Sequence, residues 1–114
     1  MLKLLSYADV YFKQREFIGF YNAGLMITFL VIAVGQHTLA DKIYSMFGQM
    51  LLTAKKYGLA LEMYSKLRNC AHTHRDVISK MYALKQMAHC FAKLEKYEDG
   101  IICLKYMLQL AWTC

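Results

Sequence analysis

A short pattern recurs three times along this chain at a spacing of 40 residues. In each copy an apolar residue is followed by a polar stretch and then by an aromatic residue, and the closing aromatics are Phe17, Tyr57 and Tyr97. This period is the size of one supersecondary unit and far exceeds the spacing of a coiled coil. The 114 residues therefore hold about three copies of one small unit, with the three aromatics at equivalent places.

The composition favours helices for these units. The chain has no proline and only 6 glycines, whereas sandwiches and barrels need regular turns built on such residues. Large apolar residues around each aromatic recur at helical spacing. Asp41 and Asp76 are expected to begin helices, because an acidic side chain there can accept hydrogen bonds from free amides. Three helical hairpins are predicted, with their helices at about 2–15 and 18–36, 40–54 and 58–70, and 76–94 and 97–112.

In the second and third units a small residue recurs near the middle of the first predicted helix, and another recurs in the following helix. Gly48 and Ala60 occupy these places in the second unit, and Ala88 and Gly100 occupy them in the third. Two antiparallel helices approach closely only where bulky side chains are missing from the crossing. These four residues are therefore predicted to mark the helix crossings.

Together these positions resemble the tetratricopeptide repeat, whose signature combines a bulky residue, Leu-Gly, Tyr, a turn aromatic, Ala, an aromatic and Ala. The resemblance is strong in residues 41–70 and 81–110 and weak in residues 18–40. It implies an all-α fold: a right-handed superhelical stack of about three antiparallel helical hairpins. One domain would cover residues 1–114, with units at about 1–40, 41–80 and 81–114.

The chain also departs from that signature. Its period is 40 residues rather than about 34, as in the longer-period members of the family, and no proline closes a unit. Phe20 stands where a small residue is expected, so the first hairpin must pack differently. A generic amphipathic helical bundle is the alternative architecture.

The resemblance implies a non-catalytic scaffold for protein–protein interaction, a subunit or a fragment of a larger assembly. Longer-period members occur in cytoskeletal and ciliary scaffolds, so a cytoplasmic location is expected by family association alone. In such arrays the first helix of each unit lines a groove that holds the partner. The groove positions here would be Lys42, Ser45, Gln49, Leu52, Tyr82, Lys85, His89 and Lys93, with Asp9 and Lys13 from the first unit.

Residues 17–35 carry no charge, which offers a second interpretation. Their length is just enough for a transmembrane helix, so the chain could be a small single-span membrane protein with a helical soluble part. Asn22 and three glycines weigh against a membrane span. If the helix is not in lipid, its apolar faces must be covered by protein.

The chemistry-bearing residues indicate neither an enzyme nor a cofactor. The set Cys70-x-His72-x-His74 does not match a structural zinc spacing, and no glycine-rich loop suits a phosphate. The net charge is +6, but the basic residues are scattered, which favours an acidic protein partner over nucleic acid.

The four cysteines and the two ends of the chain complete the expectations. Cys70, Cys90, Cys103 and Cys114 lie in apolar helical surroundings and are expected to be buried free thiols. A terminal helix of a stack needs a polar outer face. Residues 100–114 have little polar character after Lys105, so one or both ends are expected to be covered by another chain or by further sequence.

Overall fold

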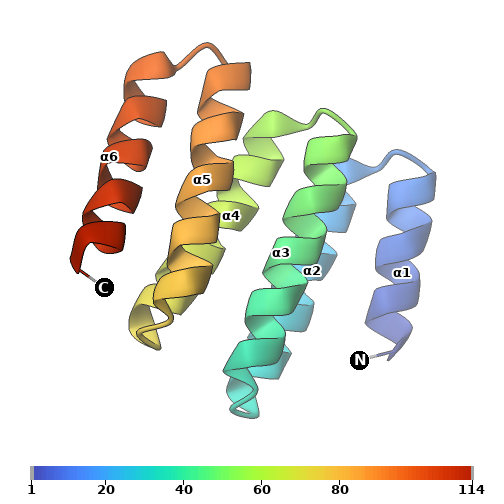
Figure 1. Ribbon diagram of the computed structural model, residues 1–114. Coiled ribbons are helices and arrows are strands. Elements are labelled where there is room, and N and C mark those ends of the chain that lie inside the picture. The colour runs from blue at the N-terminus through green and yellow to red at the C-terminus, as the bar shows by residue number, and fades with distance from the viewer. Residues whose placement is uncertain (1, 114) are drawn as a thin grey trace.

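The computed structural model describes the backbone of residues 2–113 and the side chains of residues 5–112. Within that range the chain forms six α-helices, joined by short turns, and no strand (Figure 1). The predicted all-α fold is therefore confirmed. The helices are α1 (Leu2–Lys13), α2 (Phe17–Ala33), α3 (His37–Thr53), α4 (Tyr57–Thr73), α5 (Val77–Lys93) and α6 (Tyr97–Thr113).

The helix starts reproduce the period of the sequence. Phe17, Tyr57 and Tyr97 are the first residues of α2, α4 and α6, so the three aromatics follow equivalent turns as predicted. The helices that pair with them, α3 and α5, begin at His37 and Val77. The 40-residue unit is therefore one hairpin of two helices of similar length.

Each of the first five helices is followed by a residue in the left-handed conformation, two positions after its last residue. The amide of the next residue then bonds to a carbonyl five residues back, as from Glu16 to Tyr11 at 2.8 Å and from Lys96 to Phe91 at 2.8 Å. This hydrogen-bond pattern satisfies carbonyls that a helix end leaves free. The left-handed residues are Arg15, Gly35, Lys55, Arg75 and Glu95.

The two acidic residues expected at helix starts have different positions. Asp76 does cap α5, because its carboxylate accepts hydrogen bonds from the Ser79 amide at 3.1 Å and the Ser79 hydroxyl at 2.8 Å. The prediction for Asp41 is wrong. Helix α3 already begins at His37, so Asp41 lies inside the helix, where it is buried.

The helices form two layers in a flat stack (Figure 1). In that view α3 and α5 lie in front of α2 and α4, and α1 and α6 lie at the two ends, each with one terminus of the chain. Successive helices pack against each other, and α2 also contacts α4, as α3 contacts α5. The stack measures 42 × 34 × 13 Å. The predicted stacking of hairpins is confirmed, while its right-handed sense stays a prediction.

The predicted small residues lie where helices approach closely. A Cβ atom on Gly48 would come within 2.8 Å of the Tyr64 ring on α4, and one on Gly100 would lie 3.4 Å from the Ala88 carbonyl oxygen on α5. Ala60 is fully buried, and Ala88 is 7% exposed. These positions therefore allow α3 to approach α4 and α5 to approach α6.

The first hairpin packs differently from the other two, as expected from the large Phe20 side chain. The Phe20 ring is buried and stacks on Phe47 of α3 with 4.4 Å between ring centroids, and it lies 5.1 Å from the Phe12 ring. Gly24, one turn later on α2, leaves the space that Phe47 fills, because a Cβ there would lie 2.6 Å from the Phe47 ring. The equivalent pair on α4 is Ala60 and Tyr64, so large and small residues have exchanged places between the two units.

The uncharged stretch 17–35 forms α2 and the turn after it. Six residues of α2 are buried in the stack, namely Phe20, Ala23, Gly24, Ile27, Thr28 and Val31. None of the helices within residues 2–113 has both the length and the apolar character needed to cross a membrane. The apolar composition of α2 is thus explained in part by its contacts with α1, α3 and α4.

Candidate partner-binding surfaces

A cleft of about 620 Å³ lies between α3 and α5, above Leu67 of α4. We call it the α3–α5 cleft. Its α3 wall presents residues spaced three or four apart, which share one face of a helix. The cleft is lined by Thr38, Asp41, Lys42, Ser45, Met46, Gln49, Leu67, Asp76, Ile78, Ser79 and Tyr82.

The structure brings together four of the eight predicted groove residues in this cleft: Lys42, Ser45, Gln49 and Tyr82. The other four do not line it. Leu52 packs against the core, and the side chains of Lys85, His89 and Lys93 are exposed further along α5. Only the first turns of α5 line the cleft, through Ile78, Ser79 and Tyr82.

Asp9 and Lys13 of the first unit do not reach the cleft either. They form an ion pair with each other, with 3.1 Å between the Lys13 Nζ and the Asp9 carboxylate. Both side chains are largely exposed, so the pair contributes little to stability. It is an interaction between neighbouring turns of α1.

Tyrosine side chains order the middle of the cleft. The ring of Tyr82 packs edge-on against the buried ring of Tyr64, with 6.1 Å between centroids. The Tyr64 hydroxyl donates a long hydrogen bond to the Gln49 Oε1 atom at 3.5 Å. Burial raises the pKa of Tyr64 far above its ordinary value, so the hydroxyl keeps its proton. Gln49 and Tyr82 are thus positioned by the same core residue.

Asp41 is the one lining residue whose burial is unfavourable on its own. The residue is 8% exposed, and its Oδ1 atom is buried without a hydrogen-bond partner among the described residues. Burial raises the pKa of Asp41, and the negative charge of Asp76 raises it further. A hydrogen bond from the Cys70 thiol and the nearby His74 and His37 rings lower the pKa in part. No motif in the sequence marks this buried carboxylate.

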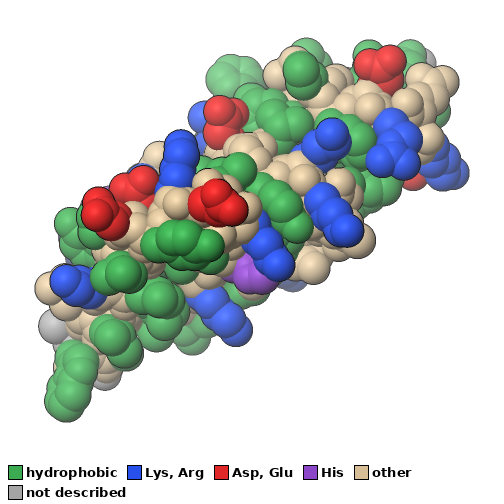
Figure 2. Space-filling model, turned by 90° about the horizontal axis from the view of Figure 1, so that it is seen from above, with side chains coloured by type: hydrophobic (Ala, Val, Ile, Leu, Met, Phe, Trp, Pro, Cys, Tyr) green, Lys and Arg blue, Asp and Glu red, His purple; other side chains and the backbone are tan. Residues whose placement is uncertain are grey.

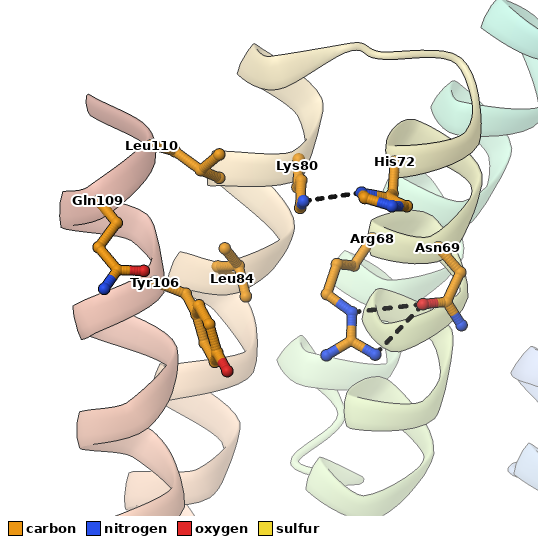
Figure 3. A pocket seen from close by; sticks show the side chains of 8 residues that line it. All are labelled: Arg68, Asn69, His72, Lys80, Leu84, Tyr106, Gln109 and Leu110. Carbon is orange, nitrogen blue, oxygen red and sulfur yellow. Dashed lines mark hydrogen bonds between the residues drawn. The ribbon is translucent and has the colours of Figure 1, made fainter. Parts of the chain in front are cut away.

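A second hollow, of about 570 Å³, lies on the opposite side of α5, between α4 and α6. We call it the α4–α6 pocket. Figure 3 shows Arg68, Asn69 and His72 on α4 facing Tyr106 and Gln109 on α6 across the space, with Lys80 and Leu84 of α5 between them. The lining residues are Arg68, Asn69, His72, Lys80, Leu84, Tyr106, Gln109 and Leu110.

The cationic side chains of this pocket are held by polar neighbours. Arg68 donates from Nε and Nη2 to the Asn69 Oδ1 atom at 3.4 and 3.2 Å, and the Lys80 Nζ lies 2.8 Å from the His72 Nδ1 atom (Figure 3). An ammonium group can only donate, so His72 accepts at Nδ1. None of the described residues that line the pocket is acidic. The sequence pattern did not reveal this pocket, because its residues come from three helices and share no local spacing.

The histidines and cysteines do not gather into a metal site. The His37 and His74 rings lie 3.7 Å apart, but no group of three or more metal-ligating side chains occurs within residues 5–112. Cys90 and Cys103 are buried free thiols, as predicted, and Cys70 is half-buried. Burial raises the pKa of Cys70 to about 12 and that of Cys90 to about 11. Cys114 lies outside the described residues.

Charge is dispersed over the end of the stack that carries the turns after α1, α3 and α5. Figure 2 shows lysine and arginine side chains scattered among hydrophobic ones, with acidic groups between them, and no continuous basic surface. Comparison of the sequence with models of known protein families gives no match, and a search of curated proteins gives no significant one.

Proposed function

We propose that this chain is a non-catalytic interaction module of the tetratricopeptide-repeat type, a subunit or fragment of a larger assembly that holds another protein in the α3–α5 cleft. The observation that carries the proposal is the cleft itself. Four residues expected at the groove from the repeat register, Lys42, Ser45, Gln49 and Tyr82, line one hollow of about 620 Å³. That volume suits a short peptide segment or a few side chains of a partner.

The chemistry of the cleft supports a mixed polar and apolar contact. Tyr82, Met46 and Ile78 offer apolar surface, and Ser45 and Gln49 offer hydrogen-bonding groups. The net charge of +6 favours a partner with an acidic surface, because complementary charge speeds encounter. The proposed setting is the cytoplasm, including cytoskeletal or ciliary assemblies, on the strength of the family resemblance.

Site-specific photo-crosslinking tests the proposal. A photoreactive residue placed at Ser45 should give a discrete protein adduct in a cell extract, and the same residue at exposed Gln14, in the turn after α1, serves as the control. The substitution Tyr82→Ala in the Ser45 probe should reduce the adduct, because it removes a wall of the cleft. Circular dichroism checks that the helices persist. An adduct that is unchanged by Tyr82→Ala, or that forms equally from Gln14, would exclude the cleft as the binding site.

A further inference from the structure

The α4–α6 pocket carries positive charge, and no acidic residue lines it within the part of the chain that the structure describes. Arg68 and Lys80 are both half-buried there, and the one ion pair found among the described side chains joins Asp9 to Lys13, on α1. The charged groups of both side chains reach the surface of the pocket, because the Arg68–Asn69 and Lys80–His72 contacts are exposed. A ligand in the pocket can therefore approach both cations.

We propose that the α4–α6 pocket binds a phosphate monoester. Two cations facing one hollow match a group with nearly two negative charges, whereas a single carboxylate would balance only one of them. The volume of about 570 Å³ leaves room for the group that carries the phosphate. This site lies apart from the α3–α5 cleft and does not depend on the function proposed for it.

Both cations are oriented before any ligand arrives. Asn69 occupies two of the guanidinium N–H groups of Arg68, and His72 occupies one N–H of the Lys80 ammonium, so the remaining donors are free for phosphate oxygens. Tyr106 adds a hydroxyl from the opposite wall (Figure 3). Preorganised donors bind more tightly because less side-chain freedom is lost on binding.

The repeat supplies an internal comparison for these residues. Forty residues earlier, Arg68 and Lys80 correspond to Thr28 and Ala40, which are both fully buried. The stack therefore accommodates small residues at both positions and does not need cations there. The equivalent hollow between α2 and α4 is lined by Leu25, Phe29, Ile32, Ala33, Tyr44 and Lys66, and it offers one cation and mostly apolar contacts.

The test is a binding titration of the full chain at constant ionic strength, monitored by amide chemical shifts in NMR. The ligands are inorganic phosphate, phenyl phosphate, a phosphoserine peptide and acetate. Phosphate should shift the amide signals of residues around the pocket. The affinity for acetate should be lower than that for phosphate by about tenfold or by a larger factor. Lys80→Ala and Arg68→Thr install the residues of the preceding unit, so both variants should fold. Each should weaken phosphate binding by about tenfold, the loss expected for a charge-assisted hydrogen bond. Lys66→Ala, which removes one positive charge from the α2–α4 hollow, should change the affinity for phosphate by less than about twofold.

The outcomes separate the source of the ligand from the existence of the site. Tighter binding of the phosphoserine peptide than of phenyl phosphate would support a site for a phosphorylated protein, and the reverse order would support a small phosphorylated molecule. If Lys80→Ala and Lys66→Ala lowered the affinity for phosphate equally, phosphate would be acting only as a counter-ion, and the proposal would be overturned. Equal affinity for acetate and phosphate, or no shifts near the pocket, would overturn it as well.

Discussion

At the scale of single residues, the two acids of the α3–α5 cleft have opposite effects on the fold. Asp76 is well placed, since it accepts two hydrogen bonds from Ser79 at the start of α5. Asp41 is buried with an unpartnered oxygen, and its pKa is raised above its ordinary value of 3.8. A buried carboxylate that binds its proton more tightly in the folded state makes folding less favourable once it ionises.

Substituting each acid by its amide tests this contrast. Asp41→Asn should raise the melting temperature at pH 7, because the folded protein no longer holds an unfavourable buried charge. Below pH 3.8 Asp41 is protonated in both states, so the gain should disappear as pH falls through the raised pKa towards that value. The control, Asp76→Asn, should lose about 0.5–1 kcal/mol, since the two hydrogen bonds from Ser79 are stronger to an ionised carboxylate than to a neutral amide. Thermal unfolding of the three proteins at both pH values measures the effect, and a stabilisation that is equal at both pH values would contradict it.

At the scale of the helix, periodicity alone was enough to predict the elements, whereas features that depend on three-dimensional packing were missed. The six helices and the equivalence of Phe17, Tyr57 and Tyr97 were inferred from apolar spacing, and the structure confirms them. The helix ends are harder to predict, because only one of the five left-handed end residues is a glycine. The sequence predicted Asp41 as a helix start, although it lies three residues before Tyr44 and seven before Gly48, on the buried face of α3.

The two candidate binding surfaces also differ in how far the sequence predicted them. Three α3 residues of the cleft, Lys42, Ser45 and Gln49, were expected from the resemblance to the tetratricopeptide repeat. Lys85, His89 and Lys93 fall outside because only the first turns of α5 line the cleft. The α4–α6 pocket could not be predicted, because Arg68, Lys80 and Tyr106 meet only when three helices pack together.

Two glycines give a direct test of helix packing. Gly48 faces the Tyr64 ring, and a Cβ there would lie 2.8 Å from it, so Gly48→Leu should overpack the α3–α4 crossing and destabilise the protein by about 1–3 kcal/mol. Gly58 is the matched control, because a Cβ at that position meets nothing within 4 Å. Gly58→Ala should stabilise the protein by about 0.5–1 kcal/mol through helix propensity alone. Urea unfolding measures both changes, and a neutral Gly48→Leu would show that α3 and α4 do not cross closely here.

At the scale of the whole molecule, the even-numbered helices α2, α4 and α6 differ sharply in how apolar their outer faces are. On α2 the exposed side chains include Ile18 at 70% and Phe29 at 71%, and on α6 Trp112 is 87% exposed. Forty residues after Phe29 the corresponding residue of α4 is Asn69, so the repeat does not require an apolar outer face. Contiguous apolar surface of this kind usually marks an interface. The large exposed apolar residues of α2, its C-cap and α6 are Ile18, Met26, Phe29, Leu30, Val34, Tyr97, Ile101, Ile102, Leu104, Tyr106, Leu108 and Trp112.

We expect the exposed apolar faces of α2 and α6 to bind other protein, and sedimentation velocity of the isolated 114 residues tests that expectation most directly. In dilute buffer without detergent, we expect concentration-dependent self-association, because the apolar faces of α2 and α6 then have only other copies to contact. Phe29→Asn, which installs the α4 residue at the equivalent place, should reduce that association while the helical content stays the same. A well-behaved monomer at micromolar concentrations, unaffected by Phe29→Asn, would contradict the claim.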